Sequence, residues 1–389
     1  MELLNKPTLL VAVVLAVCAS LYYLVVICCT WRFRHRLPYG GSSTSTPPLS
    51  VLKPLRGADP FLETNLLTHA LQDYPDFELL LGVESLDDPA AEVVDRLSSK
   101  FPDLPLKTIV CGPTLAGNPK IWQLERLAHH SHHDTFLVND ADIVVEPNYF
   151  REIVEELEAP NVGGVTCLYR ARPGGGLVSL LEALWVSAEF QGLVLTASCT
   201  QGVSFALGAT IAFRNSDLKE AGGFEVLRPF LADDYQLGNH LTKVGRRVVL
   251  SRRVVETVLP TTNWREVLQH WLRWSRTVRL SRPRGHAGLI FTHGTIWSLL
   301  ALLVCDGQTV PVVTAICCLA LRGMAAWSVG HFVVQSETVR RYGYLIFLAD
   351  LLAFVLWCVS FFGNHVVWAG RHLSLDRLGR IRQTTSNSD

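Results

Sequence analysis

An uncharged apolar segment from Pro7 to Cys29 constrains the fold of this chain more than any other feature. As an α-helix it is long enough to cross the roughly 30 Å hydrocarbon core of a bilayer. A secretory signal would have a shorter apolar region, of about 7–15 residues, followed by a cleavage site. We therefore predict an uncleaved transmembrane anchor at residues 7–30.

Basic residues follow this anchor directly, from Trp31 to Arg36, whereas only Lys6 precedes it. Because Lys and Arg concentrate in the cytoplasmic flanks of membrane helices, the chain after the anchor should face the cytoplasm. Residues 31–47 are predicted to be a basic flank and a linker, which is rich in small residues from Gly40 to Pro48. The water-facing part of the protein is then expected on the cytoplasmic side of the membrane.

Apolar sequence returns near the other end of the chain, where we predict C-terminal membrane helices over residues 286–365. Arg322 and Asp350 interrupt this region, and either charge would be costly in contact with lipid. Either these side chains face a neighbouring helix or a cavity, or one apolar block is re-entrant and does not cross. The blocks run from Gly288 to Cys305, from Val310 to Val334 and from Tyr344 to Phe362.

The composition agrees with a membrane protein that has a large water-facing part. Charged residues make up 18% of the chain, compared with roughly 25% in soluble domains. The 35 basic residues are balanced by 35 acidic residues, so no strong net field attracts nucleic acid. The last segment, residues 366–389, contains several arginines and is predicted to be a basic cytoplasmic tail.

Between the anchor and the C-terminal blocks, residues 48–262 show the pattern of an α/β domain. Short apolar strands alternate with helical stretches, at a spacing typical of a mainly parallel sheet with helices on both faces. Ligands bind such Rossmann-like sheets in the crevice outside the carboxyl ends of the strands. The predicted strands lie at residues 50–52, 78–83, 106–110 and 135–138, and the predicted helices at residues 60–73, 89–100 and 120–133.

Acidic residues stand at the ends of these strands. Two carboxylates at positions i and i+2 of a turn can bind one hard cation, Mg²⁺ or Mn²⁺, which prefers a few carboxylates together with substrate phosphates. The alternative is structural, because aspartates also cap helices and form turns. The candidates are Asp140 and Asp142 after the fourth strand, Asp88 after the second strand, and Asp233 and Asp234 before a later helix.

Residues 263–285 are predicted to form an amphipathic interfacial helix, since apolar residues recur there at helical spacing among several arginines. His270, Arg273 and Trp274 share one face of this helix, at positions i, i+3 and i+4. In one interpretation the helix contacts acidic lipid. In the other, His270 and Arg273 bind a diphosphate while Trp274 packs beneath it, because the planar guanidinium of arginine suits phosphate.

Taken in order, these polar motifs resemble those of the ceramide glucosyltransferases and their bacterial relatives, a branch of the inverting GT-A glycosyltransferases that includes family 21. The resemblance implies a GT-A catalytic domain at residues 48–262, between the N-terminal transmembrane helix and C-terminal transmembrane or re-entrant helices. The matching segments are Ser50–Pro60 (SVLKPLRGADP), Asp87–Pro89 (DDP), Asn118–Lys120 (NPK), Asp140–Asp142 (DAD), Asp233–Tyr235 (DDY) and His270–Trp274 (HWLRW).

The resemblance also implies roles for single residues. In this family the first acidic motif contacts the nucleotide, the second binds the metal and the diphosphate, and the third supplies the catalytic base. These roles fall on Asp88, on Asp140 with Asp142, and on Asp234, with Lys120 as a further residue of the donor site. The implied cofactor is a divalent cation, Mg²⁺ or Mn²⁺.

The last motif of the family lies against the diphosphate and the acceptor, which assigns donor binding to His270, Arg273 and Trp274. The chain departs from the family pattern at two positions. The motif commonly begins with Gln or Arg where His270 stands. Glu189 stands nearest to the place of a functionally important His in the eukaryotic ceramide enzymes.

The implied function is the transfer of a sugar, first of all glucose from UDP-glucose, to a hydroxyl of a membrane lipid with inversion at the anomeric carbon. Ceramide is the first acceptor to expect, and the UDP-sugar, the lipid and the membrane are the expected partners. Three alternatives stay open: a hopanoid-lipid (N-acetyl)glucosaminyltransferase, a processive polysaccharide synthase and a non-catalytic membrane receptor.

Overall fold

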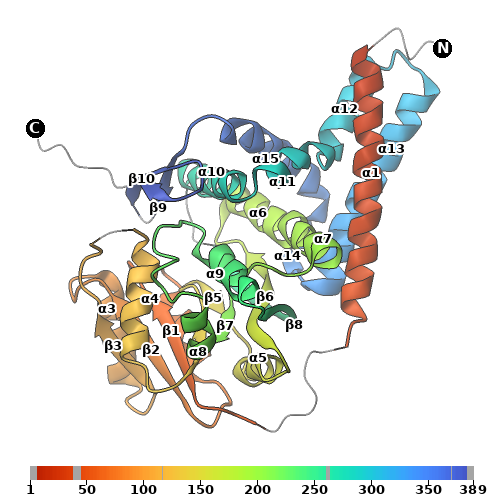
Figure 1. Ribbon diagram of the computed structural model, residues 1–389. Coiled ribbons are helices and arrows are strands. Elements are labelled where there is room, and N and C mark those ends of the chain that lie inside the picture. The colour runs from red at the N-terminus through yellow and green to blue at the C-terminus, as the bar shows by residue number, and fades with distance from the viewer. Residues whose placement is uncertain (1–6, 38–44, 116, 260–262, 369, 383–389) are drawn as a thin grey trace, which may run out of the picture. The chain divides into compact units, whose positions relative to one another are not determined.

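The computed structural model describes residues 7–37, 45–115, 117–259, 263–368 and 370–382. The chain forms two compact units, both of which are drawn in Figure 1. Each unit draws on three separate stretches of the chain. The sheet unit comprises Leu37–Tyr169, Gly202–Pro260 and Val367–Asp389, and the helical unit comprises Met1–Arg36, Arg170–Gln201 and Thr261–Val366.

The sheet unit is built on eight strands in the order β3-β2-β1-β4-β7-β6-β8-β5. From β3 to β4 the neighbouring strands are parallel, which confirms the predicted α/β fold. The pairs β4–β7, β6–β7 and β5–β8 are antiparallel, so the sheet is mixed rather than mainly parallel. The strands are β1 (Leu49–Pro54), β2 (Phe77–Val83), β3 (Leu106–Val110), β4 (Thr135–Val138), β5 (Ile143–Val144), β6 (Val162–Arg172), β7 (Ile211–Arg214) and β8 (Arg247–Val258).

Helices of the sheet unit begin where the sequence supplies capping residues. Asn118 accepts a hydrogen bond from the backbone of Lys120 at 2.9 Å, and Pro119 stands in the first turn; both features favour a helix start. That helix ends at His129, earlier than the predicted end at residue 133. The helices are α2 (Leu62–Ala70), α3 (Pro89–Lys100), α4 (Pro119–His129), α5 (Tyr149–Leu157), α8 (Asn215–Glu220) and α9 (Asp233–Lys243).

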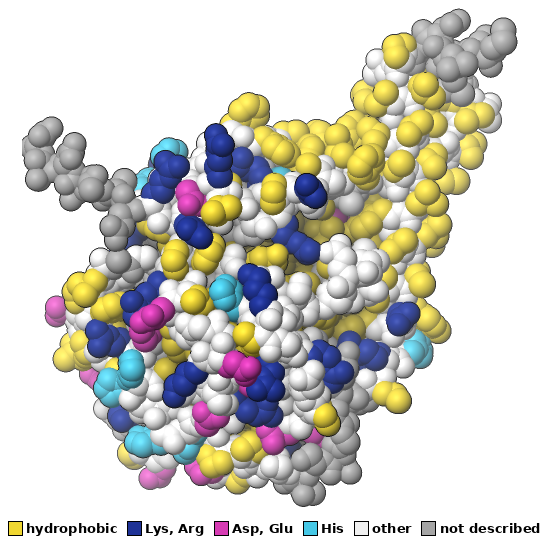
Figure 2. Space-filling model, in the orientation of Figure 1, with side chains coloured by type: hydrophobic (Ala, Val, Ile, Leu, Met, Phe, Trp, Pro, Cys, Tyr) yellow, Lys and Arg dark blue, Asp and Glu magenta, His cyan; other side chains and the backbone are white. Residues whose placement is uncertain are grey.

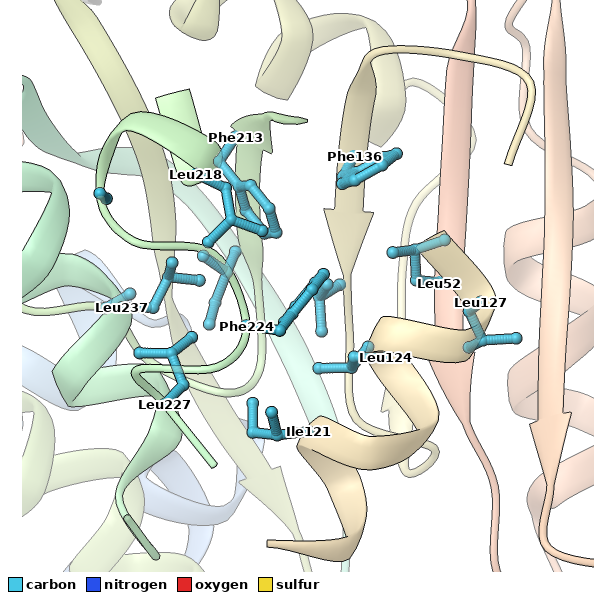
Figure 3. Packing of buried hydrophobic residues seen from close by; sticks show 14 of the residues in the cluster. Leu52, Ile121, Leu124, Leu127, Phe136, Phe213, Leu218, Phe224, Leu227 and Leu237 are labelled. Carbon is cyan, nitrogen blue, oxygen red and sulfur yellow. The ribbon is translucent and has the colours of Figure 1, made fainter. Parts of the chain in front are cut away.

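Buried apolar residues join α4 to the sheet. Leu124 of α4 belongs to the same core as Phe136 of β4 and Phe213 of β7, as Figure 3 shows. The two phenylalanine rings pack edge to face with their centroids 5.8 Å apart, and burial of each ring contributes about 1.5–3 kcal/mol. This core fixes the start of α4, and with it Lys120, against the sheet.

The chain after the apolar helices is not an extended tail, since three short strands form a second sheet there. Arg371 Nη2 lies 3.0 Å from Glu84 Oε2 of the sheet unit. Most of the segment 366–389 is therefore folded against this unit, while residues 383–389 lie outside the described part. The strands are β9 (His365–Trp368), β10 (Arg371–Leu375) and β11 (Ile381–Arg382).

In the helical unit, the described residues include five helical stretches long and apolar enough to cross a membrane. Four correspond to the predicted anchor and C-terminal blocks. The fifth, Gly176–Gln201, contains Glu182 and Glu189 and was not predicted from the sequence. The elements are α1 (Pro7–Arg34), α6 (Gly176–Leu184), η2 (Trp185–Phe190), α7 (Gln191–Gln201), α10 (Trp264–Ser281), α11 (Pro283–Gly288), η3 (Leu289–Phe291), α12 (Gly294–Val304), α13 (Thr309–Trp327), η4 (Ser328–Val333), α14 (Glu337–Tyr342), η5 (Gly343–Leu345) and α15 (Ile346–Ser360).

Small residues let α1 pack closely against α12 and α13. Ala12, Ala16 and Ala19 are fully buried, and such residues allow close approach of helix backbones in a membrane. Tyr23 Oη donates a hydrogen bond to the carbonyl of Thr292 at 2.8 Å. Hydrophobic side chains cover the visible outer surface of these helices in Figure 2, as a lipid-facing surface requires.

The two charges that interrupt the C-terminal blocks form an ion pair. Arg322 Nη2 lies 2.6 Å from Asp350 Oδ1 and Arg322 Nε lies 2.8 Å from Asp350 Oδ2. Glu189 Oε2 lies 3.0 Å from Arg322 Nη2, and Thr295 donates to Asp350 at 2.5 Å. Of the alternatives raised by the sequence, these contacts show that both side chains face neighbouring helices.

Candidate active site

The D-A-D turn, Asp140–Asp142, starts at a fixed point because the residue before it is anchored. Asn139 follows β4, is fully buried, and donates from Nδ2 to Tyr149 Oη at 2.9 Å and to the carbonyl of Ala209 at 2.7 Å. At the other end of the turn, the Thr257 hydroxyl donates to Asp142 Oδ2 at 2.5 Å. The end of β4 and Thr257 of β8 thus fix the positions of the Asp140 and Asp142 side chains.

Two buried side chains bind the backbone of the D-A-D turn. Lys53 Nζ donates to the carbonyl of Asp140 at 3.1 Å, and Asn65 Nδ2 donates to the carbonyl of Ala141 at 3.3 Å. Burial lowers the pKa of Lys53 to about 7, although the charges of Asp142 and Asp140 raise it. A lysine this deeply buried is uncommon in proteins, which marks it as a residue of the site.

Four side chains meet around Gly208. Lys120 Nζ lies 2.7 Å from Asp140 Oδ1 and 3.4 Å from Asp233 Oδ2. The Gly208 amide donates to Asp234 Oδ2 at 2.9 Å. A Cβ atom at Gly208 would lie 2.8 Å from Asp140 Oδ2 and 3.4 Å from Asp234 Oδ2, so only glycine leaves room for this arrangement. The structure therefore brings together Lys120, Asp140 and Asp234, which the sequence had singled out separately.

The electrostatics of this cluster are those of crowded carboxylates. Burial and the charge of Asp233 raise the pKa of Asp234 to about 6. Burial and the charge of Asp140 raise the pKa of Asp142. Burial favours the neutral amine of Lys120, but the surrounding carboxylates, Asp140 first, outweigh it and raise its pKa. Negative charge is thus in excess, and additional positive charge would stabilise the cluster.

The donor set of the D-A-D turn fits a divalent cation whose coordination is completed by a substrate. The described residues contain no group of three or more His, Cys, Asp or Glu side chains that could hold a metal ion alone. Mg²⁺ and similar cations are commonly bound through one or two carboxylates and substrate phosphates. Asp140 and Asp142, which repel each other, supply two such carboxylates.

Asp233 does not cap α9, contrary to one interpretation of the sequence. The residue at the cap position is Ala232, and no side chain forms a capping hydrogen bond there. Instead Asp233 is buried, accepts a hydrogen bond from Asn118 Nδ2 at 3.2 Å and pairs with Lys120. Asp233 therefore holds Lys120 and the start of α4 in place.

Asp88, in contrast, takes the structural role that the sequence left open. Its Oδ1 accepts hydrogen bonds from the backbone of Ala90 at 2.9 Å, which caps α3, and of Gly57 at 2.8 Å. The second bond joins it to the loop of the first family motif. In the part of the chain that the structure describes, no contact joins Asp88 to the cluster around Gly208, and its role in nucleotide binding stays a prediction.

His270, Arg273 and Trp274 lie on α10 in the helical unit, whereas the predicted carboxylates lie in the sheet unit. The rings of His270 and Trp274 are 4.8 Å apart, as expected for residues that share a helix face. His270 Nδ1 donates to Glu182 Oε1 at 2.6 Å, and Glu182 is buried.

Sequence reasoning did not single out Lys53, Asn65, Thr257, Gly208 or Glu182. Lys53 carried a usable signal, because a charged residue directly after a predicted buried strand is unusual. The others did not, since their roles depend on contacts between segments far apart in the chain. A Gly or Thr in an unaligned sequence has no feature that reports such contacts.

The profile of glycosyl transferase family 21 matches residues 11–381. The chain belongs to this family. Ceramide glucosyltransferase 1 of Caenorhabditis elegans is 27% identical over 234 residues, which are 60% of this chain and 50% of the relative. A ceramide glucosyltransferase of Komagataella phaffii is 30% identical over 142 residues, which are 34% of this chain and 28% of the relative. The match thus covers half of the length of the first relative and less of the second. Together with the family profile, it confirms the resemblance to the ceramide glucosyltransferase family.

A solved structure of the mannosyltransferase PcManGT from Pyrobaculum calidifontis, in complex with GDP-Man and Mn²⁺, is similar in fold to this member of family 21. The TM-score is 0.55 at 18% identity, and the match covers 91% of this chain and 99% of that chain. This similarity confirms the predicted GT-A type of fold.

Proposed function

We propose that this protein transfers glucose from UDP-glucose to a hydroxyl of ceramide, with inversion at the anomeric carbon. The observation that carries the proposal is the meeting of Asp140, Lys120 and Asp234 around Gly208 in a chain of family 21. The names of the relatives suggest the donor sugar and the acceptor.

Asp234 would act as the general base. Its raised pKa, about 6, makes it a better proton acceptor than an ordinary aspartate while leaving it ionised at neutral pH. Hydrogen bonds from the Gly208 amide to Oδ2 and from the Tyr235 amide to Oδ1 fix its orientation. It would take the proton from the acceptor hydroxyl as that oxygen attacks the anomeric carbon opposite the leaving group. A single displacement of this kind converts an α-linked donor into a β-glycoside.

Asp140 and Asp142 would hold a divalent cation, Mg²⁺ or Mn²⁺, at the D-A-D turn. When bound, such a cation acts as a Lewis acid that stabilises the departing diphosphate. The Lys120 ammonium, held by Asp140 and Asp233, would add a fixed positive charge to the donor site. Asp88 would contact the nucleotide.

From the family resemblance, we also propose that His270, Arg273 and Trp274 of α10 bind the donor. Arg273 and His270 suit negative charge on the diphosphate, and the Trp274 ring packs at a tilt against the rings of His270, Trp185 and Phe190. The apolar helices would deliver a lipid acceptor from the bilayer. Because Arg32 and Arg34 stand in the last turn of α1, the sheet unit is proposed to face the cytoplasm.

The test is an assay of the purified full-length protein in detergent with Mn²⁺, in which UDP-glucose and UDP-N-acetylglucosamine are each supplied with ceramide and with a hopanoid lipid, followed by mass spectrometry and NMR of the product. The expected product is β-glucosylceramide, and EDTA should prevent its formation. A glycosylated hopanoid, a long polysaccharide or no turnover with any lipid would each contradict the proposal and support one of the three alternatives. An α-linked product would contradict the single displacement.

A further inference from the structure

A chain of hydrogen bonds behind the D-A-D turn links β1 to α2. Lys53 is fully buried, and its Nζ lies 3.1 Å from the carbonyl oxygen of Asp140 and 3.2 Å from His69 Nε2. His69 Nδ1 lies 3.0 Å from the carbonyl oxygen of Asn65. Asn65 in turn donates from Nδ2 to the carbonyl oxygen of Ala141.

The direction of each bond in this network follows from its ends. A backbone carbonyl can only accept, so His69 carries its proton on Nδ1 and donates it to Asn65. Burial and the neighbouring charge of Lys53 lower the pKa of His69 well below its ordinary value, which keeps the ring neutral. Its Nε2 therefore accepts from Lys53, which also donates to the Asp140 carbonyl. His69 thus holds Lys53 Nζ from the side away from the D-A-D turn.

The position of this network is informative because Lys53 makes no ion pair within 4 Å among the described contacts, whereas Lys120 pairs directly with Asp140. An ammonium used for charge balance alone would be expected to contact a carboxylate oxygen. Lys53 contacts the backbone of the turn instead, as Asn65 does. Both residues are themselves buried, and each donates to one carbonyl of the turn. The Asp140 carbonyl accepts from the Ile143 amide as well, at 3.3 Å.

We propose that Lys53 and Asn65 are positioning residues, which hold the D-A-D turn ready for a divalent cation by binding two of its carbonyl oxygens. The carboxylates of Asp140 and Asp142 repel each other, and the bonds from Lys53 and Asn65 oppose this repulsion together with the bonds from the Val258 amide and the Thr257 hydroxyl to Asp142. This inference rests on the proposed function, because it requires the D-A-D turn to bind the cation. It adds two residues that touch neither cation nor substrate.

Lys53→Met tests this proposal sharply, because electrostatics and positioning predict opposite results. Removing the positive charge that Lys53 carries in its protonated form, near two carboxylates, should strengthen cation binding by Coulomb's law. Loss of positioning should weaken it, by about 10- to 100-fold as for other residues that orient metal ligands. We expect weaker Mn²⁺ binding, measured by electron paramagnetic resonance of free Mn²⁺ with the full-length protein in detergent, with and without UDP. At saturating Mn²⁺, kcat should recover most of its wild-type value.

Asn65→Leu is the second variant, and it involves no change of charge. It should weaken Mn²⁺ binding in the same direction and decides the question if Lys53→Met does not fold. Gln123→Met is the matched control, since Gln123 is buried in the same unit and donates from Nε2 to the carbonyl of Leu55 at 3.3 Å. It removes the same kind of bond away from the turn and should leave Mn²⁺ affinity unchanged.

If folded Asn65→Leu or Lys53→Met bound Mn²⁺ as tightly as the wild-type protein, or more tightly, the inference would be overturned. The absence of Mn²⁺ binding by the wild-type protein would also overturn it. Equal losses in Gln123→Met would also overturn it, because the effect would then be general destabilisation. The proposed function fails separately: a wild-type protein that binds Mn²⁺ with UDP but does not glucosylate ceramide would contradict that function and leave the positioning role intact.

Discussion

Both units of this protein hold clusters of charged side chains, but the two clusters differ in charge balance and in exposure. In the helical unit, Arg322 binds Asp350 through two hydrogen bonds and also contacts Glu189, while Thr295 donates to Asp350, so two buried carboxylates share one guanidinium. In the sheet unit, the three carboxylates of Asp140, Asp233 and Asp234 surround one ammonium group, and the Asp140 side chain is 42% exposed. The first cluster is closed by its own hydrogen bonds, whereas the second has capacity for a cation.

This difference shows that buried charge alone does not identify an active site. A charge cluster that satisfies itself stabilises the packing of helices in an apolar environment. A cluster with excess negative charge that is partly open to solvent can be stabilised by a cationic ligand, which is typical of functional sites. The comparison therefore predicts that substitutions in the sheet unit change catalysis, and that those in the helical unit change stability.

Asp234→Asn is the substitution expected to affect activity most. It keeps the size and hydrogen bonds of the side chain but removes the proposed base, so kcat should fall about 10²–10⁴-fold. UDP affinity should change little, because the base acts on the acceptor. The measurement is kcat at saturating donor, together with UDP binding by calorimetry.

Asp233→Asn is the matched comparison, since Asp233 is adjacent but pairs with Lys120 and Asn118. We expect a smaller loss of kcat and a higher KM for the donor. If Asp234→Asn retained wild-type kcat while Asp233→Asn was inactive, the two roles would be exchanged. If both stayed active, the base would lie elsewhere.

Breaking the ion pair of the helical unit should have a large effect on stability. Arg322→Met leaves Asp350 and Glu189 buried without their partner, which we expect to cost about 3–5 kcal/mol. The double substitution Arg322→Met with Asp350→Leu removes the unpaired charge at that position and should recover part of the loss. Thermal unfolding in detergent measures both. Equal stability of wild type and Arg322→Met would show that the pair does not hold these helices together.

Gly208→Ala should reduce activity without a comparable loss of stability. The added Cβ would lie 2.8 Å from Asp140 Oδ2 and 3.5 Å from Lys120 Nζ, and it displaces the groups of the proposed donor site. Small misplacements in an active site cost up to about 10²-fold in rate, so we expect kcat/KM to fall toward that value. Gly323→Ala in the helical unit is the control, because its Cβ would meet only Phe347 at 4.0 Å. Similar activity of Gly208→Ala and wild type would remove the steric argument for the site.

The sequence predicted most of what depends on local pattern. The parallel strands and the D-A-D turn were predicted from the periodicity of apolar residues and from the positions of turn residues, and the cap at Asp88 was one of two interpretations left open. The antiparallel half of the sheet was not, because strands such as β7 are short and pair with segments distant in the chain. The helical stretch Gly176–Gln201 was missed because its buried glutamates resemble those of a soluble helix.

The same limit applies to the site. The acidic motifs could be recognised as short sequence motifs, and the structure places Asp140 and Asp234 together around Gly208. The motifs did not show which role each aspartate takes. Asp88 caps a helix, whereas Asp233 pairs with Lys120. Which aspartate of an adjacent pair faces a given group depends on the direction in which each side chain leaves the backbone.

The smallest predicted effect is on acid stability and involves Glu78, which lies outside both clusters. Burial raises the pKa of Glu78, but hydrogen bonds from Ser50 and from His132 outweigh it and lower the pKa below its ordinary value of 4.5. A depressed carboxyl pKa contributes stability above the unfolded-state pKa, and this contribution is lost as the pH falls through the folded-state pKa. The His132 side chain is 69% exposed, so solvent screens its part of the interaction.

We therefore expect Glu78→Gln to lower the free energy of unfolding at pH 7 by about 1 kcal/mol, and the difference from wild type to shrink as the pH falls below 4.5. Urea titrations at a series of pH values measure it. Glu92→Gln is the control, because Glu92 pairs with Arg96 on the exposed face of α3 at 3.0 Å and both side chains are mostly exposed. Its effect should be close to zero at every pH. An equal loss in the two variants would show that the bonds to Ser50 and His132 add nothing beyond a surface ion pair.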